Sequence, residues 1–158
     1  MIHRRFQIAA YILAFIAVVD QMSKWWLVTH VMTPPPHPIY INAFLNLVLV
    51  WNKGVTFGLL SRFGEGAVPW ILVGIAVVIL GLLGRWLWRT SSTLVASALG
   101  LVMGGAVGNV IDRVRYGAVV DFLDFHLDGW HWYSFNLADS AIVVGVALLL
   151  LDGLVRGR

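Results

Sequence analysis

The stretch ASALGLVMGGAVGNVIDR, residues 96–113, decides how this chain folds. It lies in an apolar run long enough to cross a bilayer as a helix, because about 20 such residues span the hydrocarbon core. Small residues recur in it at every fourth position, and such a ridge lets a neighbouring membrane helix approach closely. The ridge consists of Ala96, Gly100, Gly104 and Gly108. We therefore predict a membrane helix that packs tightly against a partner helix.

The composition of the whole chain also indicates a membrane protein. Hydrophobic residues make up 59% of the 158 residues and charged residues only 12%, which is outside the range of ordinary soluble domains. Four stretches have spanning length, at about residues 7–28, 68–88, 94–113 and 137–155. The predicted fold is an all-α membrane protein with one four-transmembrane-helix bundle, forming a single domain over residues 1–158. The chain has no cysteine, which excludes disulfides and zinc–thiolate sites.

The first span could be mistaken for a cleavable signal peptide, since Arg4 and Arg5 precede an apolar core. It lacks a small-x-small cleavage site, however, and it continues through Asp20 and Lys24. We therefore predict a retained span.

The basic residues predict the orientation. If the spans alternate in direction, one side of the membrane receives Arg4, Arg5, Arg85, Arg89, Arg156 and Arg158. That side should be the cytoplasm, so both termini are expected there. The net charge of +3 mostly reflects this asymmetry. It forms no basic patch for nucleic acid, and the expected surroundings are membrane lipids.

The two extracytoplasmic segments, about residues 30–67 and 114–136, are predicted to form a small β-element. After several prolines, residues 39–51 are rich in β-branched and aromatic residues, which indicates one or two strands. In the second segment, Asp128-Gly129 lies between two apolar runs and predicts a type I′ hairpin. Leu127 then faces Trp130, and the same register continued along the hairpin places Asp121 opposite Asn136.

The sequence NLADS, residues 136–140, is typical of a helix start, with Asn136 as N-cap and Asp139 at the third helical position. Asp121 is then expected within one helical turn of Asp139. Two carboxylates this close cannot both ionise cheaply, so they would share a proton, as aspartic protease chemistry requires. The alternative is structural: Asp139 is only a helix cap and Asp121 a solvated residue at a strand end.

More polar residues lie at the same end of the predicted bundle. Asn109, Asp112 and Arg113 follow the spacing i, i+3, i+4 and so share one helix face. Asp20 and Lys24 are one turn apart in the first span. They form either a local ion pair or part of a functional site.

Other chemistries and classes of protein remain open at this point. Ser140 with Lys24 could form a Ser/Lys peptidase, although no spacing pairs them. His126 and His131, predicted cross-strand neighbours close to Asp124, could bind zinc. An ion-coupled transporter would place its ionisable groups near the bilayer midplane rather than at one face. A scaffold subunit would leave the acidic residues unexplained.

Five motifs together resemble the lipoprotein signal peptidase family, also called signal peptidase II. They are DQMSK at 20–24, WNKGVTFGLL at 51–60, GGAVGNVIDR at 104–113, VVDF at 119–122 and FNLADSAI at 135–142. The resemblance covers all four predicted spans and both extracytoplasmic segments. It implies an aspartic peptidase of the bacterial inner membrane, with four transmembrane helices and a small extracytoplasmic β-element.

The resemblance also implies the substrate and the roles of residues. The substrates are prolipoproteins whose cysteine already carries diacylglyceryl, cut just before that cysteine by a monomeric enzyme without cofactor or metal. The catalytic pair is Asp121 and Asp139, at the extracytoplasmic face. The residues expected to bind substrate are Asn52, Gly54, Asn109 and Arg113, and those expected to support the site are Asp20, Lys24, Asp112 and Asn136. Thr56 departs from the family, in which many members have alanine.

Overall fold

The structure is a computed structural model that describes residues 2–31, 37–54 and 66–156. Thr56 lies outside these residues. Within the described residues, four helices are long and apolar enough to cross a membrane. They are α1 (Ile2–Trp26), which continues into the π-helical turn η1 (Leu27–Val31), α2 (Val68–Arg89), α3 (Thr93–Tyr116) and α4 (Leu137–Arg156). The four predicted spans are therefore confirmed, and α3 continues past the expected end at Arg113.

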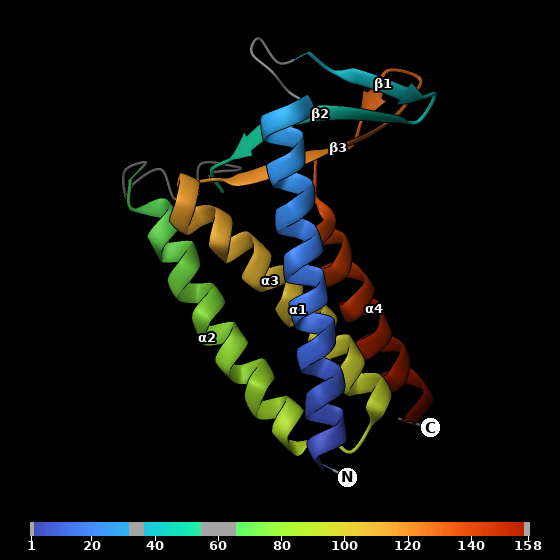
Figure 1. Cartoon of the computed structure of the whole chain (residues 1–158). Helices are drawn as coiled ribbons and strands as arrows, with labels where there is room; N and C mark the ends of the chain where they lie inside the picture. The colour runs from blue at the N-terminus through green and yellow to red at the C-terminus, as the bar shows by residue number, and fades with distance from the viewer. Residues whose placement is uncertain (1, 32–36, 55–65, 157–158) are drawn as a thin grey trace.

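A small antiparallel sheet lies at one end of the bundle (Figure 1). Its strands are β1 (Ile39–Asn42), β2 (Leu45–Asn52), β3 (Val119–Leu127) and β4 (Trp130–His131), in the order β1-β2-β3-β4. The predicted β-element is confirmed. The N-terminal end of α1 and the C-terminal end of α4 both lie at the opposite end of the bundle (Figure 1).

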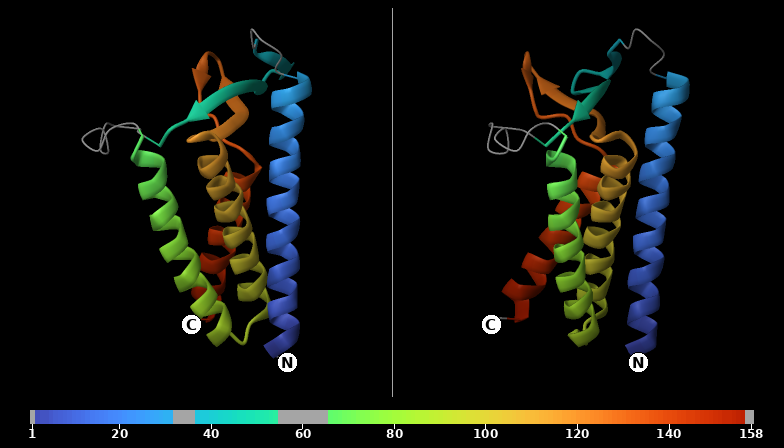
Figure 2. Two further views of the ribbon diagram at one scale, coloured as in Figure 1. Left: turned by 60° about the vertical axis from the view of Figure 1, so that its left-hand side comes forward. Right: turned by 90° about the vertical axis from the view of Figure 1, so that its left-hand side faces the viewer.

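Helix α3 is the central helix, with α1 and α4 packed against it (Figure 2). The predicted ridge of small residues makes this packing possible. A Cβ atom on Gly100 would lie 2.8 Å from the carbonyl oxygen of Ala9, and one on Gly104 would lie 2.9 Å from that of Leu13. In α4, a Cβ atom on Gly145 would lie 2.7 Å from the carbonyl oxygen of Ala98. The backbone of α3 therefore touches the backbones of both α1 and α4.

Helix α3 leads directly into the sheet. It ends at Gly117, whose φ of 69° is left-handed and whose N–H donates to the carbonyl oxygen of Arg113 at 3.0 Å. Such a C-cap favours glycine because a Cβ atom crowds the backbone at positive φ. β3 begins two residues later, so the strand that carries Asp121 starts at the end of the central helix.

The hairpin forms as predicted near its turn but not beyond it. Asp128 and Gly129 have φ values of 49° and 82°, as a type I′ turn requires, and Leu127 pairs with Trp130. The continued register is wrong, because Leu123 and not Phe122 is the bridge partner of Phe135. The Trp132 N–H still donates to the carbonyl oxygen of Phe125, as the predicted register requires, so one extra residue between Trp132 and Phe135 shifts the register by one.

The strand that aligns Asp121 is β2. Val50 pairs with Asp121 and Asn52 with Val119, so β2, which precedes α2, lies beside β3, which follows α3. Asn136 therefore does not lie opposite Asp121 in the backbone ladder.

Candidate active site

Asp121 is a buried carboxylate on β3, with 1% of its surface exposed. Its two oxygens each accept a hydrogen bond from an amide: Oδ1 from Asn136 Nδ2 at 2.7 Å and Oδ2 from Asn52 Nδ2 at 2.9 Å. Burial raises the pKa of Asp121 to about 6; the Asn52 hydrogen bond opposes this rise and the nearby charge of Asp139 adds to it. A carboxyl group with a pKa near neutrality can hold a proton or release it under physiological conditions.

Asp139 lies in the first turn of α4 and takes part in a capping box, as the sequence predicts. Asn136 Oδ1 accepts from the Asp139 N–H at 2.9 Å, and Asp139 Oδ2 accepts from the Asn136 N–H at 3.2 Å. The remaining oxygen, Oδ1, accepts from Asn109 Nδ2 at 2.8 Å. The cap and the contact with α3 together fix this carboxylate at the sheet end of the bundle.

Two asparagine side chains connect the carboxylates. Asn136 Nδ2 donates to Asp121 and also, at 3.2 Å, to Oδ1 of Asn109. The Nδ2 group of Asn109 in turn donates to Asp139. The structure therefore brings Asp121 and Asp139, from a strand and a helix, into one hydrogen-bonded network. The electrostatic effect of Asp139 on Asp121 agrees with this proximity.

A buried ionic cluster supports the network from behind. Lys24 Nζ lies 2.8 Å from Asp20 Oδ2 and 2.8 Å from Asp112 Oδ2, and all three side chains are nearly inaccessible. Asp20 Oδ1 accepts from the Ala138 N–H at 3.0 Å, and Asp112 Oδ2 accepts from the Val120 N–H at 3.1 Å. Asp20 and Lys24 therefore form the local ion pair that the sequence offered as one alternative. Asp20 also contacts α4, and Asp112, the second partner of Lys24, contacts β3.

Gln21 belongs to this cluster and was not predicted. Its Nε2 donates to Asp112 Oδ1 at 2.7 Å and to the carbonyl oxygen of Gly108 at 3.1 Å. The sequence feature that could have indicated its role is its position next to Asp20 in a mostly apolar span.

The predicted substrate-binding residues surround the two carboxylates. Asn52 Oδ1 accepts from the Gly54 N–H at 2.9 Å, and Gly54 has a φ of 74°. Arg113 Nη1 donates to the carbonyl oxygen of Asn109 at 3.2 Å. Within the part of the chain that the structure describes, the buried Nε of Arg113 has no hydrogen-bond partner. Only part of the Arg113 guanidinium is thus used in hydrogen bonds within the described part of the chain.

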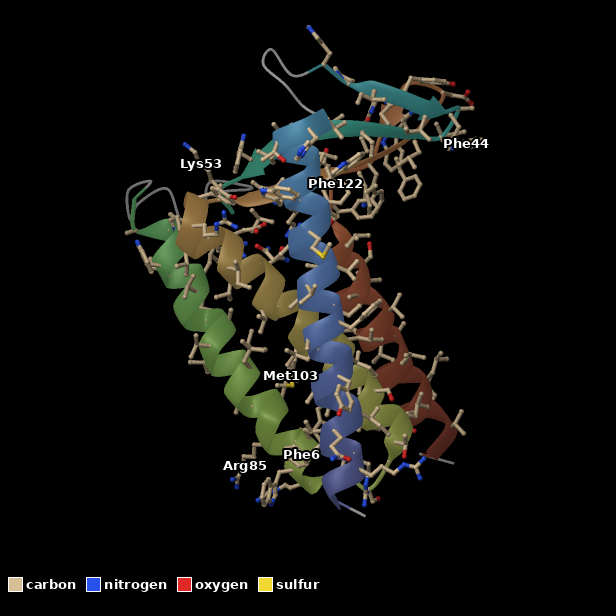
Figure 3. All side chains as sticks on the ribbon, in the orientation of Figure 1. Phe6, Phe44, Lys53, Arg85, Met103 and Phe122 are labelled. Carbon is tan, nitrogen blue, oxygen red and sulfur yellow. The ribbon has the colours of Figure 1, made fainter. Side chains whose placement is uncertain are left out.

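Asp121 and Asp139 each line a different cavity. A cavity of about 750 Å³ contains Asp121 and is lined by Asn52, Gly54 and Asp124 among others. A more apolar cavity of about 690 Å³ contains Asp139, together with Phe125, Phe135 and Val143. Residues 132–134 line both. Lys53, which lines the first cavity, and Phe122 lie at the sheet end of the bundle, whereas Arg85 lies at the far end (Figure 3).

Some of the residues considered for a zinc site form a hydrogen-bonded cluster. His126 and His131 are cross-strand partners, as predicted, and His131 Nδ1 lies 2.9 Å from Asp124 Oδ2. Asn46 Nδ2 also donates to Asp124, at 3.1 Å. Burial tends to raise the pKa of Asp124, but the hydrogen bonds with His131 and Asn46 outweigh it and lower that pKa. Across residues 2–31, 37–54 and 66–156, no three His, Asp or Glu side chains gather in a way that could hold a metal ion.

Ser140 and Lys24 do not form a peptidase pair here. Ser140 Oγ donates to the carbonyl oxygen of Asn136 at 3.0 Å, as a residue in the first turn of a helix often does. Lys24 Nζ is occupied by Asp20, Asp112 and Asn109.

Comparison with known proteins places this site in a family. Residues 12–155 match the family described as signal peptidase (SPase) II. The lipoprotein signal peptidase of Methylobacterium sp. (strain 4-46) is 47% identical over 135 residues, which cover 85% of this chain and 81% of the relative. That of Methylocella silvestris is 42% identical over 151 residues, covering 96% and 88%. A bacterial membrane enzyme solved in meso at 1.9 Å has a TM-score of 0.77 and 31% identity, covering 91% of this chain and 90% of that one. The chain belongs to the signal peptidase II family of aspartic membrane peptidases.

Proposed function

We propose that this chain removes the signal peptide from prolipoproteins whose cysteine carries diacylglyceryl, cleaving just before that cysteine. Asp121 and Asp139 are the catalytic pair. The observation that carries this proposal is their convergence on Asn136 from β3 and α4, at one end of a bundle of spanning helices. Membership of the family and the names of the relatives support the substrate class.

The arrangement suits the chemistry of an aspartic peptidase. One carboxylate takes a proton from water while the water oxygen bonds to the scissile carbonyl carbon, and the other, protonated, donates to the carbonyl oxygen. The C–N bond then breaks as the new amine receives a proton, so the pair ends with the single proton with which it began. The raised pKa of Asp121 supports such sharing, because two neighbouring carboxylates titrate as a pair.

The surrounding residues have distinct proposed roles. Asn52 and Asn109 each donate to one catalytic carboxylate, so they orient the pair as well as border the substrate. Arg113, with an unpartnered Nε, holds a carbonyl oxygen of the substrate. Gly54 leaves room for the substrate backbone. The ion cluster of Asp20, Lys24 and Asp112 connects the elements that carry the site, which are α1, α3, β3 and α4.

The same geometry suits a substrate that is anchored in lipid. A diacylglyceryl cysteine lies in the outer leaflet, so its preceding peptide bond is presented at the membrane interface. The carboxylates lie on β3 and in the first turn of α4, at the sheet end. Arg85 lies at the other end of the bundle (Figure 3). We place the chain in the bacterial inner membrane as a monomer, with its termini in the cytoplasm and its active site at the extracytoplasmic face.

Isosteric variants test the proposal. Asp121→Asn and Asp139→Asn should each lower the rate of cleavage of purified diacylglyceryl-prolipoprotein by at least about 10³-fold, and the double variant should be little worse, since the residues act as a unit. The cap of α4 is Asn136, which both variants retain, and an Asn at position 139 keeps one oxygen to accept from the Asn136 N–H, so a loss at Asp139 is not a capping effect. Asp128→Asn is the control, because Asp128 is exposed in the hairpin turn, where Asn is equally suited to positive φ. Chelators should leave the rate unchanged. Near wild-type cleavage by either single variant would refute the proposal.

A further inference from the structure

The amide groups around the two carboxylates can take only one orientation. A backbone N–H can only donate, so Oδ1 of Asn52 must face the Gly54 N–H and Oδ1 of Asn136 must face the Asp139 N–H. The Nδ2 groups of both asparagines are thereby directed at Asp121. Their orientation follows from the fixed donors on their oxygens.

Asn109 is fixed in the same way by a charged donor. Its Oδ1 accepts from Lys24 Nζ at 3.3 Å and from Asn136 Nδ2 at 3.2 Å. An ammonium group has no acceptor, so the amide nitrogen of Asn109 must point away from Lys24, and it donates to Asp139 Oδ1 at 2.8 Å. Lys24 cannot easily rotate away, because Asp20 and Asp112 each hold it at 2.8 Å.

The two carboxylates consequently have different surroundings. Asp139 accepts a backbone N–H at a helix N-terminus, where the helix dipole favours negative charge, and it also accepts the Asn109 amide. Of the carboxylate charges that act on the Arg113 guanidinium, that of Asp139 has the largest effect. Asp121 lies on a strand rather than in the first turn of a helix, and accepts from the amides of Asn52 and Asn136, and its burial raises its pKa.

We propose that Lys24 and Asn109 form a positioning relay that keeps Asp139 ionised, so that Asp121 carries the single proton of the resting catalytic pair. This inference rests on the proposed function and assigns the roles of base and acid to the two carboxylates. Asp139 accepts the proton of the attacking water as the C–O bond forms, and Asp121 gives its proton to the carbonyl oxygen. Asp139 then protonates the leaving nitrogen as the C–N bond breaks, and Asp121 recovers a proton from the new carboxyl product.

The charged groups that face the pair come from each element packed around it. α1 contributes Asp20 and Lys24, and α3 contributes Asp112 and Arg113. The cavity on Asp121 also contains Lys53, Asp124 and His131. Among these groups, Lys24 is connected to Asp139 through the side-chain amide of Asn109. A substitution at Asn109 therefore interrupts the effect of Lys24 on Asp139.

The experiment interrupts the relay at Asn109. Lys24→Met would leave Asp20 and Asp112 buried without their cation and would unfold the bundle, whereas Asn109→Leu keeps the ion cluster. The readout is the pH dependence of kcat/KM for diacylglyceryl-prolipoprotein. Asn109→Leu should move the acidic limb upward by about one to two pH units, the range expected when a charged hydrogen bond is lost. Asn46→Leu is the matched control: it removes an amide that donates to Asp124 instead, and it should leave that limb in place.

A second readout does not depend on activity. Infrared difference spectra between pH 8 and pH 5 should show a buried protonated carboxyl group that disappears in Asp121→Asn and persists in Asp139→Asn. Loss of that band in Asp139→Asn, or an Asn109→Leu variant slowed equally at every pH, would overturn the inference. Wild-type cleavage by Asp121→Asn would instead refute the proposed function itself.

Discussion

Asn136 donates to Asp121 Oδ1 at 2.7 Å from the position that caps α4. One side chain thus begins a helix with its oxygen and holds a carboxylate on another element with its nitrogen. The capping task needs only a short acceptor, which serine also provides. Contact with Asp121 needs the amide.

Replacing Asn136 should therefore separate stability from activity. Asn136→Ser keeps an acceptor for the Asp139 N–H but loses the donor to Asp121, and Asn136→Ala loses both. The alanine variant should be less stable than the serine variant by about 1 kcal/mol, the usual value of a cap. Both should cleave about 10- to 100-fold more slowly than wild type, which corresponds to a lost hydrogen bond to a charged group. Thermal unfolding in detergent and cleavage assays measure the two effects. Wild-type cleavage by Asn136→Ser would show that the amide does not position Asp121.

The pH dependence of cleavage should follow the titration of Asp121. Its pKa is raised from 3.8 to about 6, chiefly by burial, so the folded protein favours the protonated form. That contribution to stability is complete below 3.8 and is lost as the pH rises through about 6. Above about pH 6 a growing fraction of the Asp121 carboxyl groups loses the proton. Because the pair needs one proton, kcat/KM should fall as the pH rises above about 6. A rate that instead rises through this range would mean that Asp121 acts unprotonated.

The sequence predicts the parts of the structure that depend on local rules. Spans follow from the length of apolar runs, the cap at Asn136 from the residues of one helical turn, and the Leu127–Trp130 pair from a two-residue turn. The spacing of the glycines likewise predicts the close contact of α3 with α1.

What the sequence misses depends on distant contacts. No turn joins β2 to β3, so nothing local fixes the pairing of Val50 with Asp121. The hairpin turn sets the register only as far as Trp132, whose N–H donates to Phe125, whereas Phe135 pairs with Leu123 and is displaced by one residue. Asp121 still contacts Asn136, but through side chains rather than through the ladder.

The hairpin turn should matter for stability more than for catalysis. Gly129 has a φ of 82°, and a Cβ atom there would meet nothing within 4 Å, so Gly129→Val is strained by its backbone alone. We expect a loss of about 1 to 3 kcal/mol in stability. Cleavage should fall only a few-fold, because β2 holds Asp121 independently of β4. Gly74→Val, in open space on α2 and without positive φ, is the control. A loss of activity as deep as that of Asp121→Asn would show that β4 aligns the carboxylate.

The orientation in the membrane can be tested with reporters. Arg4, Arg5, Arg85 and Arg89 should lie on the cytoplasmic side, together with the end of α4. A reporter fused after Arg158 should be active in a form that works only in the cytoplasm. A second reporter inserted at Gly129, in the hairpin at the other end of the bundle, should be active only outside it. Periplasmic activity of the first fusion would reverse the proposed topology.

The contact between α3 and α4 should control the position of Asp139. A Cβ atom on Gly105 would collide with the carbonyl oxygen of Ala138, the residue immediately before Asp139. Since both groups belong to backbone, Gly105→Ala must push the first turn of α4 away from α3 and lengthen the bond between Asn109 and Asp139. We expect a loss of about 1 to 3 kcal/mol in stability and roughly a 10²-fold fall in kcat, the typical cost of a displacement of about 1 Å. Gly81→Ala, which meets nothing within 4 Å on α2, should leave both quantities near wild type. Equal activity of the two variants would mean that the spacing of α3 and α4 does not set the geometry of the catalytic pair.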